Sequence, residues 1–486
     1  MRFWERVKQM IRSWLEIQPA PGRGVTIQEP VSHGTNVLRN RLWYRGDASE
    51  LDQLFKVLGD DAVGRARFWA AAPQSETIRK AHSGVPGIMV DTLVGVVRAD
   101  LTDLDFEDSE AAARWDAVAD ENNFDALVAQ AVADVLVTGD GAFKISLDRD
   151  VSDRPILEFW GADRVEYQRR HGRIYAVDFL TPVGEQGRVL RERYAPGGVH
   201  YALLDGDREL PLDGYPELAD LQDVTFDDDQ LLAVPVQFWP SARWRGRGQS
   251  IFDKKTDAFD AHDEIISQWM DAIRAGRVQK YIPESLIPRD PVTGALRMPN
   301  SFGTNFVQVG SSAKENAEEK IDTVQPQIEY EAFVASYSAT LDMCLQGIMS
   351  PATLGVDVGK MASAEAQREK KDITGMTRNA ITAALEKALP RLAQAALQAE
   401  DLLAGRSPGS YNATVSFGEY GAPDFDSRVQ TVGQAATTGV MSVEAQVDEL
   451  WGDSKDDAWK QAEVARIRQE RGIETVEEPS LGGSSL

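Results

Sequence analysis

The sequence has little cysteine, no excess of positive charge and no long apolar run. Its 486 residues include one cysteine, Cys344, which cannot form an internal disulfide or supply a multi-cysteine zinc site. Cys344 stands among Leu341, Met343 and Leu345, which predicts a buried apolar role rather than a nucleophile. No apolar stretch reaches about 18 residues, so we expect no membrane span. These features favour assembly in a reducing compartment.

The charge balance is strongly acidic, with 52 Lys and Arg against 77 Asp and Glu and a net charge of -25. A protein that grips nucleic acid usually has a basic balance or a basic patch. The overall charge therefore disfavours a repressor, a nuclease or a polymerase. Two other roles remain open: the acids keep a large protein soluble, or they line a channel through which a polyanion slides without adhering.

Motifs of catalysis and cofactor binding are also missing. The five histidines do not have HExxH spacing. Residues 355–360 resemble a phosphate-binding loop, but only three residues separate the two glycines, and Met361 replaces the Ser or Thr that would reach magnesium. We therefore predict no enzymatic activity, no cofactor, and no catalytic, cofactor-binding or metal-ligating residues.

Residues 1–30 are predicted to form an amphipathic helix (1–17) followed by a linker rich in Pro and Gly. The apolar residues that recur at helical spacing are Phe3, Val7, Met10, Ile11, Trp14 and Leu15. We expect the helix to dock on its own domain or on a neighbouring subunit, with contact to a membrane surface as the alternative. Its charges are scattered among the apolar residues, which does not fit a signal peptide.

Residues 31–249 carry the patterns of a mixed domain. Helical spacing covers 47–58 and 107–137, and the second stretch ends at the turn signal Gly139-Asp140-Gly141. Short strand-like runs follow at 142–147, 156–160, 164–167, 174–179, 200–204 and 230–238. The pattern predicts an α+β fold class.

Residues 250–275 form a strong helix candidate without internal Gly or Pro, long enough to span on the order of 40 Å. One predicted face is apolar and contains Phe252, Phe259, Ile266, Trp269 and Ile273. The opposite face is an acidic stripe of Asp253, Asp257, Asp260, Glu264 and Asp271. The stripe is either a solvated face or a wall that repels a polyanion, and the residues alone leave both open.

The chain beyond this helix alternates irregular segments with helices. We expect an insert at 278–326 with strands at 279–282 and 306–309, then a helix at 327–349 and a break at 350–361. The next predicted helix is capped by Ser363, is interrupted at Gly375 and Pro390, and ends near 403. A strand at 411–417 and helices at 427–438, 442–450 and 455–471 follow. The polar tail 474–486 is predicted to be disordered.

Five segments, in this order, resemble the portal proteins of tailed bacteriophages. They are Trp43-Tyr44-Arg45-Gly46-Asp47 followed by Leu51 and Leu54-Phe55; Ala133 to Lys144 with its Gly-Asp-Gly turn; Gly248-Gln249-Ser250-Ile251-Phe252; Ser363-Ala364-Glu365-Ala366; and Thr438 to Ser442 with Asp456-Asp457-Ala458 and Ile467 to Glu470. The resemblance covers the chain from about 35 to 472. The N-terminal basic helix has no counterpart in it.

The resemblance implies a portal-protein fold assembled as a ring of usually twelve subunits, without enzymatic activity. The implied regions are an N-terminal helix and linker (1–30), an α/β wing (31–249 and 362–436), two stem helices (250–277 and 327–349), a small α/β clip (278–326), a tunnel loop (350–361), a helical crown (437–472) and a disordered tail (473–486). Such a ring forms the channel at one capsid vertex through which double-stranded DNA is packaged and ejected.

The resemblance also assigns roles and partners. It places the acids Asp253, Asp257, Asp260, Glu264 and Asp271 on the channel face of the stem, the five apolar residues of the same helix in stem packing, and Thr353, Leu354, Gly355, Val356, Asp357, Val358, Gly359, Lys360 and Met361 in the tunnel loop, with Lys360 facing DNA. The implied partners are other copies of the chain, the terminase large subunit, head-completion or adaptor proteins, and the major capsid and scaffold proteins.

The implied location is the virion, after assembly in the host cytoplasm. Two alternatives to a portal remain open at this point. One is a capsid-associated adaptor or scaffold protein without a channel, which would form no closed ring. The other is an acid-dependent phage hydrolase or nuclease, which would lose activity when one pair of acids is changed.

Overall fold

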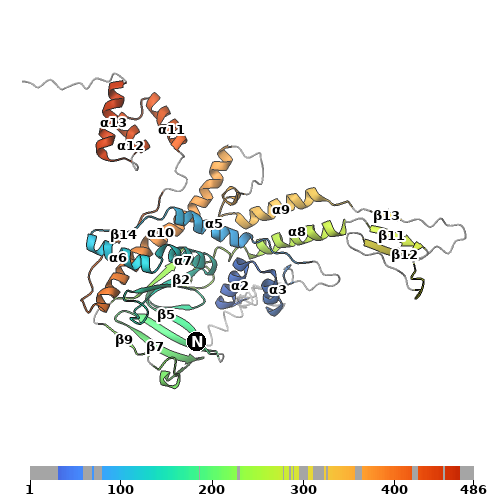
Figure 1. Ribbon diagram of the computed structural model, residues 1–486, viewed down its shortest axis with the longest axis horizontal. Coiled ribbons are helices and arrows are strands. Elements are labelled where there is room, and N and C mark those ends of the chain that lie inside the picture. Colours follow the sequence, from blue (N-terminus) through green and yellow to red (C-terminus); the bar gives the residue numbers. More distant parts are fainter. Residues whose placement is uncertain are drawn as a thin grey trace, which may run out of the picture. The chain divides into compact units, whose positions relative to one another are not determined.

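The computed structural model describes residues 31–58, 68–70, 79–184, 187–219, 221–226, 230–276, 279–283, 286–287, 289–294, 305–309, 322–324, 327–355, 364–418, 425–451 and 455–470. The chain divides into two compact units, Met1–Phe417 and Gly418–Leu486, and each is described by itself. The predicted N-terminal helix (1–17) and the predicted disordered tail (474–486) lie outside the described residues. The described residues combine helices with largely antiparallel sheets, which confirms the α+β fold class (Figure 1).

The first unit contains most of the helices and all the strands described. The helices are α2 (His33–Arg45), α3 (Ala48–Val57), α5 (Val85–Ala99), α6 (Ser109–Glu121), α7 (Phe124–Thr138), α8 (Thr256–Ala275), α9 (Tyr330–Leu345) and α10 (Ala364–Leu403), with 3-10 turns at Leu212–Gly214 and Pro351–Leu354. No helix in the described ranges is both long and apolar enough to cross a membrane.

The strands of the first unit pair into four sheets. One has the order β10 (Ala233–Gln237), β2 (Asp140–Ser146), β3 (Ile156–Gly161). The largest has the order β4 (Val165–Arg170), β5 (Arg173–Val183), β6 (Arg188–Ala195), β7 (Gly198–Asp205), β8 (Arg208–Leu210), with β9 (Val224–Thr225) on β7. The others are β12 (Asn305–Val309), β11 (Gln279–Pro283), β13 (Asp322–Val324), and the pair β1 (Asp105–Phe106) and β14 (Ala413–Thr414). Only the β11–β12 pair is parallel among them.

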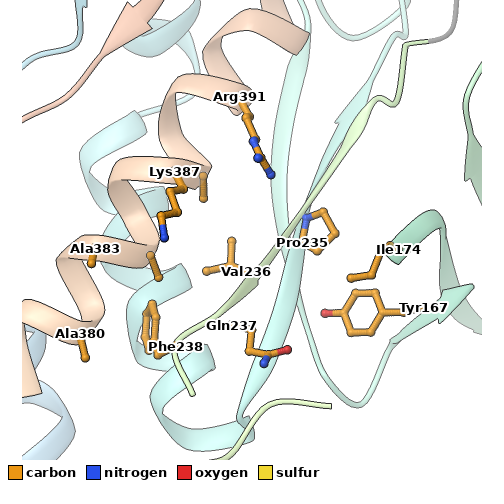
Figure 2. A pocket seen from close by; sticks show the side chains of 12 residues that line it. Tyr167, Ile174, Pro235, Val236, Gln237, Phe238, Ala380, Ala383, Lys387 and Arg391 are labelled. Carbon is orange, nitrogen blue, oxygen red and sulfur yellow. The ribbon is translucent and has the colours of Figure 1, made fainter. Parts of the chain in front are cut away.

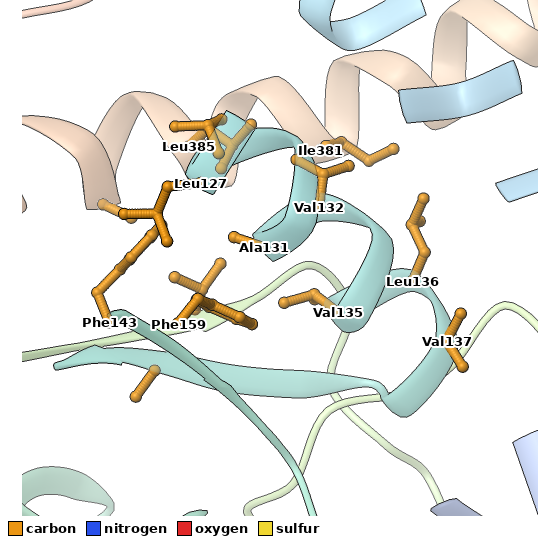
Figure 3. Packing of buried hydrophobic residues seen from close by; sticks show 14 of the residues in the cluster. Leu127, Ala131, Val132, Val135, Leu136, Val137, Phe143, Phe159, Ile381 and Leu385 are labelled. Atoms are coloured by element: carbon orange, nitrogen blue, oxygen red, sulfur yellow. The ribbon is translucent and has the colours of Figure 1, made fainter. Parts of the chain in front are cut away.

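The main core forms where α7 and α10 pack on the β10-β2-β3 sheet. Figure 2 shows β10 between α10 and the strands that carry Tyr167 and Ile174. Figure 3 shows α7 between α10, which contributes Ile381 and Leu385, and the strands that carry Phe143 and Phe159. All four of these core residues are nearly or fully buried. The buried residues of α7, which lie at the end of the helical stretch predicted for 107–137, therefore hold this core together, because they lie between two layers.

Two glycines bring distant segments into close contact. A Cβ on Gly139 would lie 2.6 Å from the carbonyl oxygen of Gly248, and one on Gly248 would lie 1.9 Å from that of Gly139. Between them, Asp140 is fully buried; its Oδ2 accepts a hydrogen bond from the Gly248 amide (2.5 Å) and its Oδ1 pairs with Arg247 (3.0 Å). The Gly-Asp-Gly turn and the segment that leads into α8 thus require glycine for close backbone approach.

Several elements differ from the sequence-based expectation. Helices α2 and α5 were not predicted: α2 buries the polar residues Asn36, Arg39 and Asn40, so its sequence has no clean apolar stripe. The expected interruptions of α10 at Gly375 and Pro390 are wrong, since the helix is continuous with Pro390 inside it. Leu389 and Leu392 beside this proline are fully buried. Their tertiary packing therefore outweighs the hydrogen bond that proline removes.

The first predicted stem helix begins later than expected. Residues 251–255 form turns, and α8 starts at Thr256 rather than at Ser250. The turns close through bonds from the Asp253 amide to the Ser250 carbonyl (3.2 Å) and from the Lys255 amide to the Phe252 carbonyl (2.8 Å). Helical spacing cannot distinguish such tight turns from a first helical turn, because both place every third residue on one side.

The second unit contains α11 (Phe425–Thr437), α12 (Val443–Trp451) and α13 (Asp457–Glu470), each within a few residues of its predicted bounds. The indole rings of Trp451 and Trp459 meet edge to face with centroids 5.6 Å apart. The unit begins at Gly418 and so includes α11, whereas the sequence placed residues up to 436 with the wing.

Candidate functional site

The predicted stem helices α8 and α9 lie side by side and antiparallel (Figure 1). The indole ring of Trp269 stacks on Phe333 with centroids 6.1 Å apart and planes 2° from parallel. Further along, the His262 ring lies 4.9 Å from that of Tyr337. Along this contact the residue numbers increase on α8 while they decrease on α9, so the two helices are antiparallel. In the chain, the β12-β11-β13 sheet lies between the two helices, so they form one helical hairpin with a small sheet inserted in it.

Asp260, predicted to face a channel, is buried inside the chain. The residue is 6% exposed, and its carboxylate accepts hydrogen bonds from the backbone amides of Phe68 (2.8 Å) and Trp69 (3.2 Å). The prediction for Asp260 therefore needs correction, because its oxygens are used to hold the segment 68–70 on α8. Helical spacing could not predict this burial, because a buried acid and a solvated acid can occupy the same position in the helical repeat.

Asp253 is also engaged within the chain. Its Oδ1 accepts hydrogen bonds from the side-chain amides of Asn36 (2.9 Å) and Asn40 (3.1 Å), and its Oδ2 accepts one from the Ser250 amide (3.0 Å). These bonds fix the turn before α8 against α2. Asp253 thus lies in the turn before α8 and is partly exposed, and its role on a channel face stays a prediction.

The other three acids of the predicted stripe remain at the surface of α8. Asp257 is exposed, while Glu264 and Asp271 are partly exposed. Glu264 accepts a hydrogen bond from the side-chain amide of Gln268, one helical turn away (2.9 Å). Their role on a channel face stays a prediction.

Asp263, which is not part of the predicted stripe, is the most enclosed acid of α8. It is fully buried; its Oδ2 lies 2.6 Å from His82 Nδ1 and 3.1 Å from Trp69 Nε1, and its Oδ1 accepts the Ser83 amide (2.8 Å). Ser267, one turn later, accepts the Ala81 amide (2.9 Å). Residues 79–84 carry no regular element. No sequence signal pairs this irregular segment with α8, so these partners could not be predicted.

The predicted packing residues of the first stem helix divide into three groups. Phe252 and Phe259 are buried in the main core, where Phe259 lies 5.7 Å from the Trp43 ring. Trp269 packs on α9, as described, and Ile266 is partly buried. Ile273 is 51% exposed. One apolar stripe thus serves the core at its start, the partner helix in its middle and no described contact at its end.

The far part of the hairpin leaves further apolar side chains exposed in the single chain. Besides Ile273, these are Met270 (46%) on α8 and Tyr330 (60%) and Val334 (42%) on α9. Scattered exposed apolar residues are ordinary, but a concentration on the same stretch of a helix pair is typical of an interaction surface. We call these four residues the distal apolar surface.

The predicted tunnel loop is described only at its start. Thr353 and Leu354 belong to the 3-10 turn Pro351–Leu354, which Gly355 ends with a left-handed φ of 70°. The Thr353 hydroxyl lies 3.0 Å from that of Thr374 on α10, so the start of the loop is anchored. Residues 356–361, with Val356, Asp357, Val358, Gly359, Lys360 and Met361, lie outside the described residues, and the role of Lys360 stays a prediction.

One cysteine and one short sequence motif are relevant to catalysis. Cys344 on α9 is fully buried and burial raises its pKa to about 12, which confirms the apolar role expected for it. The segment Gly405-Arg406-Ser407-Pro408-Gly409 matches the Gly-x-Ser-x-Gly pattern of hydrolases, so one sequence motif of catalysis is present after all. It follows the end of a helix instead of forming a strand-to-helix turn, so it lacks the context of a nucleophile elbow. Within the described ranges, no group of three or more His, Cys, Asp or Glu could hold a metal ion.

Comparisons with known proteins give structural similarity only. A chain from the neck of the empty gene transfer agent (GTA) particle, computed with C6 symmetry, matches at a TM-score of 0.40 and 12% identity over 80% of this chain and 91% of that chain. A chain of the native GTA virion matches at 0.38 and 12% over 85% and 98%. A chain from the native GTA neck, computed with C12 symmetry, matches at 0.39 and 12% over 80% and 91%. No family model and no curated protein matches the sequence. At this level of similarity, function has to be argued from the chain's own residues.

Proposed function

We propose that this chain is the subunit of a phage portal: a closed ring, usually of twelve copies, that forms a DNA channel at one capsid vertex. The observation that carries the proposal is the α8–α9 hairpin with its inserted sheet and its distal apolar surface. The five segments that resemble portal proteins support it, because the third of them, 248–252, leads directly into this hairpin.

The distal apolar surface supports assembly through the hairpin. Burying an exposed Ile, Val or Met side chain contributes about 1.5–3 kcal/mol, so its burial favours a partner over water. A ring brings each hairpin against a hairpin on either side and would bury such residues in every copy. Heterologous contacts of this kind close into rings when the rotation between subunits allows it.

The acids at the surface of α8 support a channel wall. Asp257, Glu264 and Asp271 have side chains that reach solvent in the single chain. A ring would repeat each of them around one axis, and like charges facing a duplex would repel its phosphates and limit adhesion. In this proposal the insert 278–326 is the clip that meets the terminase large subunit and later the head-completion proteins, while the major capsid and scaffold proteins surround the ring in the virion.

The first experiment is mass photometry of the purified chain, combined with negative-stain images. The proposal expects a particle near twelve times 53.6 kDa with a central hole. Because some rings need scaffold protein to close, the measurement is repeated with the scaffold protein added. A chain that stays monomeric in both conditions, or forms an open adaptor-like assembly, contradicts the proposal. A compact dimer that cleaves a substrate would favour the hydrolase alternative.

A further inference from the structure

A concentration of arginines stands out in a chain of net charge -25. The turn between β4 and β5 reads Arg169-Arg170-His171-Gly172-Arg173, and all five residues are exposed. A loop distant in sequence, 241–248, reads Ser-Ala-Arg-Trp-Arg-Gly-Arg-Gly and contains no acid. From 164 to 175 the only acid is Glu166. Two basic segments therefore interrupt a mostly acidic sequence.

The structure joins these segments into one surface. Arg169 Nη2 donates to the carbonyl oxygen of Gly246 (2.7 Å), which ties the hairpin turn to the loop. Arg247 holds the loop along β4 by donating to the carbonyls of Val165 (2.8 Å) and Ala162 (2.7 Å). The hairpin, which is far from the loop in sequence, thus shares a surface with it.

Helix α10 adds cations to the same surface. A groove of about 820 Å³ is lined by Arg169, Arg173 and Arg391 together. Lys387 and Arg391 extend from α10 on the side that faces β10 and the strands carrying Tyr167 and Ile174 (Figure 2). We define the arginine patch as Arg169, Arg173 and Arg391, which line this groove, together with Lys387 of α10 and the exposed Arg170 and Arg245, which neighbour Arg169 and Gly246 in the sequence.

The patch is not neutralised within the described part of the chain. There, no carboxylate lies within 4.0 Å of the charged groups of these six residues, whereas Arg247 next to them pairs with Asp140 at 3.0 Å. Arg169 uses backbone carbonyls instead, which satisfy its N–H groups but leave its charge in place. A set of uncompensated cations on an acidic protein is a local anion-binding surface.

Aromatic rings lie close to several of the guanidinium groups. Arg170 Cζ lies 4.3 Å from the centroid of the Tyr175 ring, and Arg169 Cζ lies 5.8 Å from that of Tyr167. In the loop, Arg243 lies over Trp244 at 5.3 Å. An aromatic ring attracts a nearby guanidinium, which then loses less freedom on binding, and the planar group can make a bidentate contact with phosphate oxygens.

We infer that the arginine patch is a docking site for the phosphate backbone of duplex DNA, separate from the acids of α8. DNA is favoured over an acidic protein segment because five of the six charges are guanidiniums and lie mostly at exposed turns, with neighbouring aromatic faces already covered by arginine. The inference goes beyond the proposed channel, since the patch belongs to the single chain and does not need a ring.

The test is DNA binding by the full chain, measured by fluorescence anisotropy of a labelled duplex of about 30 base pairs between about 50 and 200 mM salt. Contact with about five phosphates predicts a slope of log affinity against log salt near -4.5. The triple variant R170Q/R173Q/R245Q is expected to lose at least about tenfold in affinity at low salt and to have a slope shallower by roughly 3.

The matched control is R98Q/R208Q/R274Q, which removes the same charge from three exposed arginines elsewhere. It is expected to stay within about twofold of the parent chain. Equal losses in both triple variants, or no loss in the patch variant, would overturn the inference. So would a Glu-rich peptide of similar charge that displaces the duplex and binds more tightly, since the site would then recognise acidic protein. Melting curves confirm that each variant is folded.

The same samples separate this inference from the proposed function. Mass photometry reports ring formation, and anisotropy reports DNA binding by the patch. If the protein forms a ring but the patch variant binds DNA like the parent, only the inference about the patch is contradicted. If the protein forms no ring but its DNA binding depends on these arginines, only the portal proposal is contradicted.

Discussion

The two halves of α8 have opposite relations to the rest of the chain. In the first half, acidic side chains are buried and bonded: Asp260 and Asp263 accept hydrogen bonds from the segments 68–70 and 79–84. In the second half, the apolar side chains of Met270 and Ile273 are about half exposed. One continuous helix thus buries acidic side chains in its first half and exposes apolar side chains in its second half.

The difference indicates where each half finds its partners. Buried carboxylates are tolerated only when several donors satisfy them, so the first half depends on contacts within the chain. Exposed apolar surface gains most from contacts that the single chain does not provide. The first half therefore belongs to the fold, and the second half to the assembly that we propose.

The largest effect is expected for Asp263→Ala in the first half. The change leaves His82, the Trp69 indole N–H and the Ser83 amide without their buried acceptor. Breaking such a buried, paired site typically costs about 3–5 kcal/mol. Urea unfolding of the variant, under conditions where the parent is not assembled, measures the loss in free energy of unfolding.

The control is the adjacent residue, Glu264→Ala, which removes a partly exposed acid of the same helix. We expect it to change the free energy of unfolding by less than about 0.5 kcal/mol. If Asp263→Ala lowered the free energy of unfolding no more than Glu264→Ala does, the comparison would fail, because the first half of α8 would then not depend on its buried contacts.

A smaller effect, on assembly rather than on folding, is expected for Ile273→Asp in the second half. Losing the burial of this side chain removes about 1.5–3 kcal/mol per subunit contact, and a charge at the interface adds to the loss. We expect the melting temperature of the single chain to be unchanged and ring formation to require at least about tenfold more protein, as measured by mass photometry across a dilution series.

Val57→Asp provides the matched control, because Val57 on α3 is 83% exposed and lies outside the hairpin. It should assemble like the parent chain. If both variants assemble normally, the distal apolar surface is not an interface, and the contrast between the halves of α8 carries no functional meaning.

Periodicity predicted the fold where one face of an element is apolar. It located α7, α8, α9 and most strands of the wing, since burial of one side leaves a repeat in the sequence. It missed α2, whose buried side includes Asn36, Arg39 and Asn40, because polar residues in a core erase that repeat. It wrongly broke α10 at Pro390, because the packing that stabilises this proline comes from residues elsewhere in the chain.

The candidate site was predictable to a smaller extent. The sequence identified the hairpin and its acids, but it could not show the partners of Asp253 and Asp260, which come from α2 and from residues 68–70. The arginine patch was hidden by the net charge, which averages over the whole chain. Runs of arginine at 169–173 and 243–247 were visible, but only the bond from Arg169 to Gly246 shows that they share a surface.

The smallest effect concerns pH and again the first half of α8. The His262 ring is fully buried, and burial is the main cause that lowers its pKa from the ordinary value of 6.5. Within the described residues its Nε2 has no hydrogen-bond partner, while Nδ1 lies 2.8 Å from the Thr340 hydroxyl of α9. Below about pH 6.5 the unfolded chain therefore takes up the proton more readily than the folded chain. The free energy of unfolding consequently decreases as the pH is lowered.

We expect His262→Asn, whose amide can replace the contact to Thr340, to flatten this dependence between about pH 7 and 5.5, by at most about 1.4 kcal/mol per pH unit. The control is His200→Asn, which changes a histidine whose side chain is half exposed. Urea unfolding at several pH values measures both. Parallel pH curves for the parent and the His262 variant would show that the packing of α8 on α9 tolerates a charge, so that even the first half of the helix would be less enclosed than its contacts indicate.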